Sequence, residues 1–126
     1  MSKQTNPVMV IEDEGPIALY LQELLQQNGF ETCLFTEGEP ALAAAQLASF
    51  SAAVVDLGLP DISGEEVVKA FASKYPWLPI LVSTGHDVRA LQQWLPSAQN
   101  IRVISKPFDS EDFLENIRQL RVASAA

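Results

Sequence analysis

The chain has 126 residues, a length typical of one domain, and 48% of them are hydrophobic, which is enough for a buried core. Its formal net charge of −8 predicts repulsion from nucleic-acid phosphates, and no basic stripe offsets that charge, so we expect no nucleic-acid partner. The single cysteine excludes an internal disulfide. The sequence shows no apolar segment of a signal peptide and no apolar run near the ~18 residues of a membrane span. We therefore expect a cytoplasmic protein with no membrane partner.

Five short apolar segments alternate with segments of helical spacing along the chain. We expect β-strands at residues 8–11, 32–35, 52–55, 79–83 and 101–104. We expect a helix after each strand. The first runs from Pro16 to a stop at Asn28–Gly29, and the second from a capping Thr36 to about Ala48. The third runs through Val68 to Tyr75, the fourth through Val88 and Leu95 to Pro96, and the fifth through Phe113 to Leu120 with Asp109 as its cap. The second helix is rich in alanine, which favours helix but predicts thin packing. Cys33, in the second strand, is expected to be a small buried hydrophobe.

The first, third and fourth apolar segments are apolar at every position rather than at alternate positions. Such strands are typical of a parallel sheet that is covered by helices on both faces. We therefore predict an α/β fold with a doubly wound parallel sheet. The predicted domain spans residues 8–121, with an N-terminal extension at 1–7 and a frayed tail of small residues at 122–126.

Functional side chains follow four of the five expected strands, at the point where each strand ends. They are Glu12 and Asp13 after the first strand, Asp56 after the third, Thr84 and His86 after the fourth, and Lys106 after the fifth. Thr36 and Glu37, after the second strand, look like helix-capping residues instead. Because ligands of an open parallel sheet bind beyond the carboxyl ends of its strands, we expect the first group of side chains to share one site.

Each of these side chains has an ordinary explanation on its own, such as a helix-terminal acid, a solvated loop carboxylate or an exposed lysine. Together they have a chemical meaning. Asp13 and Asp56, with help from Glu12, offer the oxygen ligands that suit Mg²⁺, and a carboxylate beside a metal can attack phosphorus. The Lys106 ammonium and the Thr84 hydroxyl can stabilise phosphoryl oxygens. The sequence therefore predicts phosphoryl chemistry at Asp56, which would explain why an apolar strand ends on a carboxylate.

Four motifs, in this order and at these spacings, resemble those of response-regulator receiver domains of two-component signal transduction. They are "VIEDE", "VVDLGLPDISG", "ILVSTGH" and "ISKPF", within a resemblance that runs from about Val8 to Leu120. The resemblance implies a flavodoxin-like fold, with a five-stranded parallel sheet of order 2-1-3-4-5 and five flanking helices. It also implies a phosphoprotein that is not an enzyme, because it catalyses only its own phosphorylation and dephosphorylation.

By this resemblance, Asp56 accepts a phosphoryl group from a phosphohistidine on a histidine kinase or a histidine phosphotransfer protein, with Mg²⁺ as the cofactor. The implied metal ligands are Glu12, largely through a water, Asp13, Asp56 and the backbone carbonyl of Gly58. Thr84 is implied to be the switch hydroxyl, Lys106 to contact the phosphate, and the Lys106–Pro107 peptide bond to be cis. Phosphorylation is implied to switch the binding of an output partner that the sequence does not identify, and we expect a monomer or a weak dimer.

Two features depart from the family pattern. Val103 stands where the family often has Tyr or Phe, so the ring that moves with the switch hydroxyl is absent. The segment "SAQNIR" stands where Gly-Ala-Asp is often found before the fifth strand. We therefore expect phosphorylation to change partner binding at the surface formed by the fourth helix, fifth strand and fifth helix. The movement would come from the loop after the fourth strand, with Gly85 as its hinge in place of the moving ring.

Other functions remain open at this point. The chain could be a phosphorelay intermediate from a hybrid kinase with weak conformational output, or a receiver-like interaction module that is not phosphorylated. An enzyme or a flavoprotein on the same fold is less well supported. Carboxylates follow the first strand where a flavin phosphate would need a Ser/Thr/Gly-rich loop, and Gly58 stands where a haloacid-dehalogenase-like phosphatase has its second acid.

Overall fold

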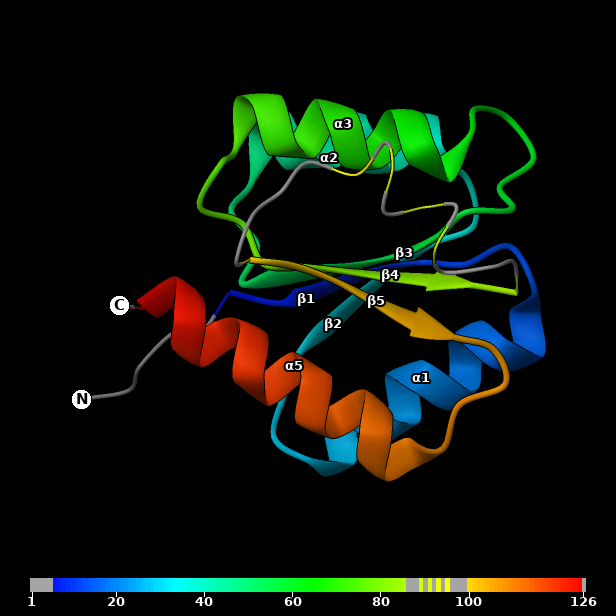
Figure 1. Cartoon of the computed structure of the whole chain (residues 1–126), viewed down its shortest axis with the longest axis vertical. Helices are drawn as coiled ribbons and strands as arrows, with labels where there is room; N and C mark the ends of the chain where they lie inside the picture. The colour runs from blue at the N-terminus through cyan, green and yellow to red at the C-terminus, as the bar shows by residue number, and fades with distance from the viewer. Residues whose placement is uncertain are drawn as a thin grey trace.

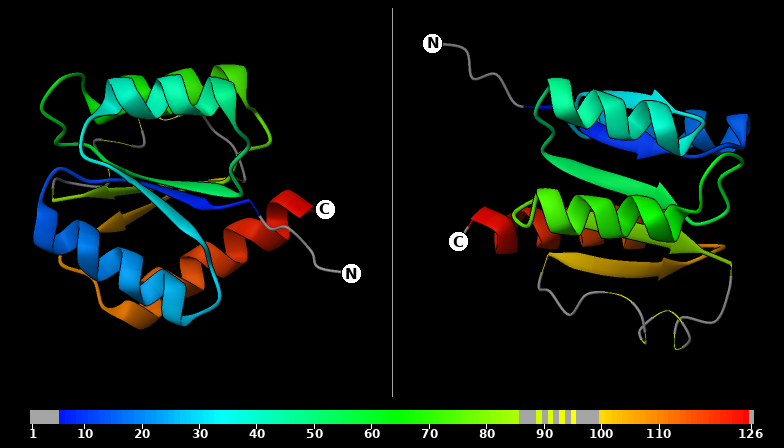
Figure 2. Two further views of the ribbon diagram at one scale, coloured as in Figure 1. Left: turned by 180° about the vertical axis from the view of Figure 1, so that it is seen from behind. Right: turned by 90° about the horizontal axis from the view of Figure 1, so that it is seen from above.

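A single parallel sheet lies between two layers of helices (Figure 1). The computed structural model of the chain describes residues 6–85, 89, 91, 93, 95 and 100–125, with side chains as far as Leu120. The strand order is β2-β1-β3-β4-β5, and every neighbouring pair of strands is parallel. Helices α1 and α5 cover one face, and α2 and α3 lie side by side over the other (Figure 2). The doubly wound fold and its strand order are thus confirmed.

In the described residues, a helix follows each of the strands β1, β2, β3 and β5. The strands are β1 Val8–Ile11, β2 Thr32–Phe35, β3 Ala52–Asp56, β4 Ile80–Thr84 and β5 Ile101–Ser105. The helices are α1 Gly15–Gln27, α2 Gly38–Leu47, α3 Gly64–Lys74 and α5 Ser110–Ala125. All five strands lie within one residue of their predicted bounds. The fourth of the five predicted helices, through Val88 to Pro96, falls largely outside the described residues.

The core consists of two clusters, one on each face of the sheet. Consecutive residues of β1 point to opposite faces, so Val8 and Val10 pack in the cluster with α1 and α5 while Met9 and Ile11 pack in the cluster with α2 and α3. Every residue of β1, β3 and β4 is buried, which explains why these strands are apolar without alternation. The outer strands β2 and β5 are only partly buried. Cys33, in β2, is therefore half-buried rather than buried as expected.

The helix ends confirm most of the predicted capping residues and correct one. Helix α1 ends at Gln27 with Asn28 as its C-cap, and Gly29 has a positive φ of 88°, which favours glycine. Asp109 caps α5, since its carboxylate accepts a hydrogen bond from the backbone N–H of Asp112 at 2.8 Å. The prediction that Thr36 caps α2 is wrong, because Glu37 occupies the N-cap position and makes no side-chain cap hydrogen bond. The α5 helix continues to Ala125, into the segment for which the sequence predicts a frayed tail.

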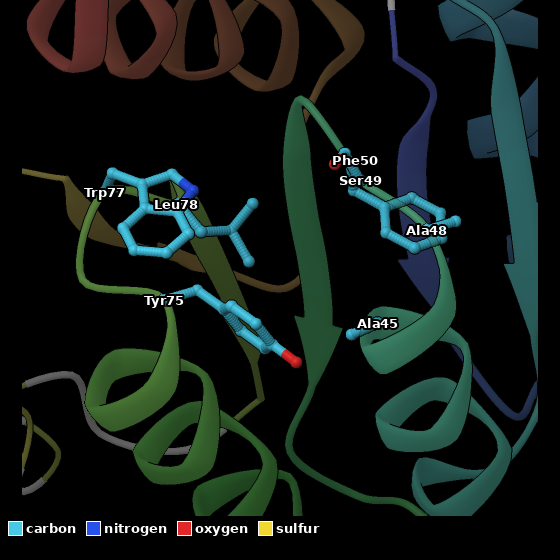
Figure 3. A pocket seen from close by; sticks show the side chains of 7 residues that line it. All are labelled: Ala45, Ala48, Ser49, Phe50, Tyr75, Trp77 and Leu78. Atoms are coloured by element: carbon cyan, nitrogen blue, oxygen red, sulfur yellow. The ribbon is translucent and has the colours of Figure 1, made fainter.

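Helix α2 packs thinly at its C-terminal end, as its alanine-rich sequence predicts. A pocket of about 100 Å³ lies between the ends of α2 and α3 (Figure 3). Its lining residues are Ala45, Ala48, Ser49, Phe50, Tyr75, Trp77 and Leu78. This pocket lies at the amino end of β3 and β4, whereas the functional residues predicted from the sequence follow the carboxyl ends of the strands. Within the described part of the chain, no helix combines the length and the hydrophobicity needed to cross a membrane.

Candidate functional site

The carboxyl ends of four strands bring the predicted side chains to one edge of the sheet. Glu12 follows β1, Asp56 ends β3, Thr84 ends β4 and Lys106 follows β5. Asp56 pairs with Ser83 in the β3–β4 register, and the backbone N–H of Lys106 donates to the carbonyl of Thr84 at 2.7 Å. These side chains therefore meet because the strands are parallel and in register, as the sequence predicted.

Three carboxylates form a cluster at this edge. One oxygen from each of Glu12, Asp13 and Asp56 lies within 4.8 Å of the others. Glu12 is 1% exposed and Asp56 is 6% exposed, whereas Asp13 is exposed to solvent. Buried carboxylates this close repel one another unless a cation lies near them. The cluster is open to solvent on the Asp13 side, which leaves a route for such a cation.

Lys106 provides one positive charge to this cluster. Its ammonium lies 3.2 Å from Glu12 Oε1 and 3.1 Å from Asp56 Oδ1, so it bridges the two buried carboxylates. Burial acts to lower the pKa of Lys106, but the hydrogen bond and charge of Asp56, joined by those of Glu12, raise that pKa overall. Lys106 is therefore charged at neutral pH and holds Asp56 from one side.

The cluster remains short of positive charge. Burial, joined by the charge of Asp56, raises the pKa of Glu12 to about 7, although Lys106 and the backbone N–H of Glu14 act to lower it. When all three carboxylates are ionised, they and the one ammonium carry a formal charge of −2, which one divalent cation would balance. Oxygen ligands of this kind, with room for waters, suit Mg²⁺. The three carboxylates among the predicted metal ligands thus fit a magnesium ion.

The loop after β3 approaches the site closely because it contains glycines. A Cβ on Gly64 would lie 2.4 Å from the carbonyl oxygen of Asp56 and 2.5 Å from the Cα of Leu57, so only glycine fits there. The backbone N–H of Gly64 donates to the carbonyl of Leu57 at 3.2 Å, which closes the loop. Gly58 is exposed, and a Cβ on it would lie 3.9 Å from Asp56 Oδ2. Gly58 therefore lies beside the carboxylate and leaves one approach to it open.

The remaining predicted residues lie around this centre. Thr84 is 1% exposed at the end of β4, and Gly85 follows it at the surface with no heavy atom near its missing Cβ. The Lys106–Pro107 peptide bond is cis, as the resemblance implied. Val103 is half-buried in β5, on the same side of the sheet as α2 and α3. His86, predicted at the rim, lies outside the described residues.

Sequence reasoning missed two residues that shape the loop, Asp61 and Gly64. Asp61 caps α2 from a position more than 20 residues along the chain, and Gly64 packs against the backbone beside Asp56. Asp61 follows Pro60, a pair typical of a turn, and Gly64 starts a helix after a capping Ser63. Those patterns place Asp61 in a turn and Gly64 at the start of a helix. They do not show which distant backbone each one touches.

Comparisons with known proteins agree with this geometry. The family model described as "Response regulator receiver domain" matches residues 8–118. The chain is 34% identical over 119 residues to the transcriptional regulatory protein CreB of Escherichia coli (strain K12), covering 93% of this chain and 51% of CreB. It is 26% identical over 117 residues to the response regulator receiver protein CpdR of Brucella abortus (strain 2308), covering 93% and 98%.

A solved structure also carries a relevant ligand. The response regulator protein TrrA of Thermotoga maritima, crystallised in complex with Mg²⁺ and BeF, superimposes with a TM-score of 0.81 at 25% identity, covering 92% of this chain and 99% of TrrA. The chain spans about half the length of CreB and of several other curated relatives that it matches. Its likeness to those proteins therefore concerns their receiver portions.

Proposed function

Because this chain belongs to the response regulator receiver domain family, we propose that Asp56 is the residue that accepts the phosphoryl group. The observation that carries this assignment is the position of its carboxylate. Asp56 is buried at the end of β3, beside the acids Glu12 and Asp13 and 3.1 Å from the Lys106 ammonium. Glu12 has the same neighbours and lies 3.2 Å from the ammonium, but Asp56 also has the glycine Gly58 beside it, which leaves one approach to its carboxylate open.

The proposed reaction is a transfer from a phosphohistidine to Asp56. An oxygen of the Asp56 carboxylate forms a bond to phosphorus, the bond from phosphorus to the imidazole nitrogen breaks, and that nitrogen keeps the electron pair and takes a proton from solvent. Glu12, Asp13, Asp56 and the Gly58 carbonyl would hold the Mg²⁺ ion, which supplies positive charge to the phosphoryl oxygens when bound. Hydrolysis of the acyl phosphate by water would restore the carboxylate. The protein therefore catalyses only its own phosphorylation and dephosphorylation.

Lys106 and Thr84 have distinct proposed roles around the phosphoryl group. In the unmodified protein the Lys106 ammonium pairs with Asp56 and with Glu12, so it is already positioned for a phosphoryl oxygen when one arrives. Thr84 ends the neighbouring strand and its carbonyl is hydrogen-bonded to Lys106, so a movement of its hydroxyl toward the phosphoryl group is transmitted to β5. That coupling is the proposed start of the switch, with Gly85 as the hinge.

An apolar pocket beside Lys106 supports a protein as the phosphoryl donor. This pocket has a volume of about 340 Å³ and is lined by Ile17, Tyr20, Lys106, Pro107 and Phe108. Tyr20 is 48% exposed and Leu19, next to it on α1, is 55% exposed. Large apolar side chains at the mouth of a reactive site suit docking of another protein surface. We assign this surface to the histidine kinase or histidine phosphotransfer protein that carries the phosphohistidine.

The test is phosphorylation by a small acyl-phosphate donor with Mg²⁺, followed as intact mass. The wild-type protein should gain one phosphoryl group, and Asp56→Asn should gain none. The matched control is Asp112→Asn, which changes an exposed carboxylate in the first turn of α5 and should be phosphorylated like the wild type. If Asp56→Asn is phosphorylated at the wild-type rate, the assignment of Asp56 is wrong.

A further inference from the structure

The loop between β3 and α3 is fastened to a second helix, α2, through Asp61. The backbone N–H of Gly38 donates to Asp61 Oδ1 at 2.8 Å, and the backbone N–H of Glu39 donates to Asp61 Oδ2 at 2.7 Å. Gly38 and Glu39 are the first two residues of α2, whose N–H groups have no partner within the helix. Both carboxylate oxygens of Asp61 are therefore used to cap a helix that is 22 residues away along the chain.

The side chain after Asp61 strengthens the same contact. A Cβ on Gly38 would lie 2.6 Å from Ile62 Cγ1 and 2.9 Å from Val67 Cγ2, so Ile62 packs directly against the backbone at the start of α2. Gly38 is buried, although α2 begins there. The loop thus meets α2 by a pair of hydrogen bonds and by an apolar contact at the same point.

Asp61 makes these hydrogen bonds as an anion. The desolvation that acts to raise its pKa is outweighed by hydrogen bonds from the backbone N–H groups of Glu39, Gly38 and Ile62 and of Asp61 itself, so its pKa lies below the usual value. Hydrogen bonds to an ionised acceptor are stronger than those between neutral groups. The negative charge also lies at the positive end of the α2 dipole.

The loop between β3 and α3 is held at two points, one on each side of Gly58 along the chain. At the near end, the Leu57 N–H donates to the Ser83 carbonyl at 3.3 Å and the Leu57 carbonyl accepts from Gly64 at 3.2 Å. At the far end, Asp61 is held by α2. Gly58, whose carbonyl is a proposed metal ligand, lies between the two anchors.

We propose that Asp61 is a positioning residue for the phosphorylation site, because its bonds to the start of α2 hold Gly58 beside the Asp56 carboxylate. This inference rests on the proposed function. A loop that is already fixed loses little conformational freedom when Gly58 binds a metal, whereas a loose loop must be ordered first and binds more weakly. By reciprocity, metal binding must strengthen the bonds of Asp61 to α2 by the same factor.

The experiment compares three variants in a titration with Mg²⁺ alone, followed by backbone amide chemical shifts at a temperature where each variant is folded. Asp61→Ala should raise the dissociation constant for Mg²⁺ by about tenfold. This is the smaller end of the loss in metal affinity that follows when a residue that positions a metal ligand is removed. Asp61→Asn keeps one accepting oxygen and should lie between Asp61→Ala and the wild type. The matched control is Ser63→Ala, which removes a cap in the same loop that serves only α3 and should change the affinity by less than about twofold.

A second measurement uses the wild-type protein and so does not depend on the folding of a variant. Addition of Mg²⁺ should slow hydrogen exchange of the Gly38 and Glu39 amides, which lie outside the metal cluster. Equal Mg²⁺ affinities for Asp61→Ala and the wild type, an equal loss in Ser63→Ala, or unchanged exchange at Gly38 and Glu39 would overturn the inference. Each of these results would leave the proposed function intact, since that function is tested separately, by the phosphorylation of Asp56→Asn.

Discussion

Substitution of Gly64 by alanine should damage both the stability of the fold and the phosphorylation site. The added Cβ would lie 2.4 Å from the Asp56 carbonyl oxygen and 2.5 Å from Leu57 Cα. Both of these atoms belong to the backbone, so no side chain can rotate to relieve the contact. The start of α3 must instead move away from the end of β3, which stretches the hydrogen bond between Gly64 and Leu57.

The expected magnitude depends on two opposing effects. Inserting a methyl group into a filled site costs about 1–3 kcal/mol, and a clash with backbone belongs at the upper end of that range. Replacing glycine by alanine also lowers the entropy of the unfolded chain, which stabilises the protein by about 0.4–1 kcal/mol wherever alanine fits. We therefore expect Gly64→Ala to lower the free energy of unfolding by about 2 kcal/mol.

Gly15→Ala is the matched control for this substitution. Gly15 is also the first residue of a helix, but it is exposed, and apart from its two chain neighbours a Cβ there would meet no heavy atom within 4 Å. Gly15→Ala should change the free energy of unfolding by less than about 1 kcal/mol, because the lower entropy of the unfolded chain is offset by the contact of the new Cβ with the ring of Pro16. The assay is urea unfolding followed by circular dichroism. If the two variants have the same free energy of unfolding, the close approach of Gly64 to the Asp56 backbone is refuted.

Two further predictions concern the acid cluster and the donor surface. Without Mg²⁺, the folded Glu12 carboxyl has a pKa of about 7 against 4.5 when unfolded, so wild-type stability should fall as the pH rises from about 4.5 to 7. Glu12→Gln should not show this loss of stability, so above pH 7 its free energy of unfolding in urea should exceed that of the wild type by about 1–3 kcal/mol. The same difference between the two proteins at pH 5 would contradict the reasoning. Tyr20→Ala should slow phosphorylation by a phosphohistidine protein but not by a small acyl phosphate, whereas Leu47→Ala, another exposed apolar residue, should affect neither. Equal rates for Tyr20→Ala and Leu47→Ala with the protein donor would remove Tyr20 from the docking surface.

The strands and the residues at their ends could be predicted because they depend on local pattern and on one general property of parallel sheets. Apolar runs without alternation indicate strands that are covered on both faces, and the residues that come directly after parallel strands lie at one edge of the sheet. That is why Glu12, Asp56 and Lys106 can be grouped from the sequence alone. The structure adds their distances, and it shows that Lys106 bridges the other two.

The contacts that the sequence did not reveal join segments far apart in the chain. Thr36 is a reasonable cap for α2 on local grounds, but Asp61 reaches the free N–H groups of that helix from the loop after β3. The need for glycine at position 64 likewise depends on where the end of β3 lies relative to α3. Cys33 is half-buried because β2 is an edge strand, which a strand's own composition does not show. Local propensity cannot specify such tertiary contacts.

The most direct test of the central assignment is to locate the phosphoryl group chemically. The protein is incubated with Mg²⁺ and a small acyl-phosphate donor, and then treated with borohydride, which reduces an aspartyl phosphate to homoserine. Peptide mass spectrometry then identifies the altered residue. The account predicts one modified position, Asp56, and no modification when Mg²⁺ is removed by a chelator. Homoserine at Asp13 or at any other aspartate, with Asp56 unchanged, would contradict it.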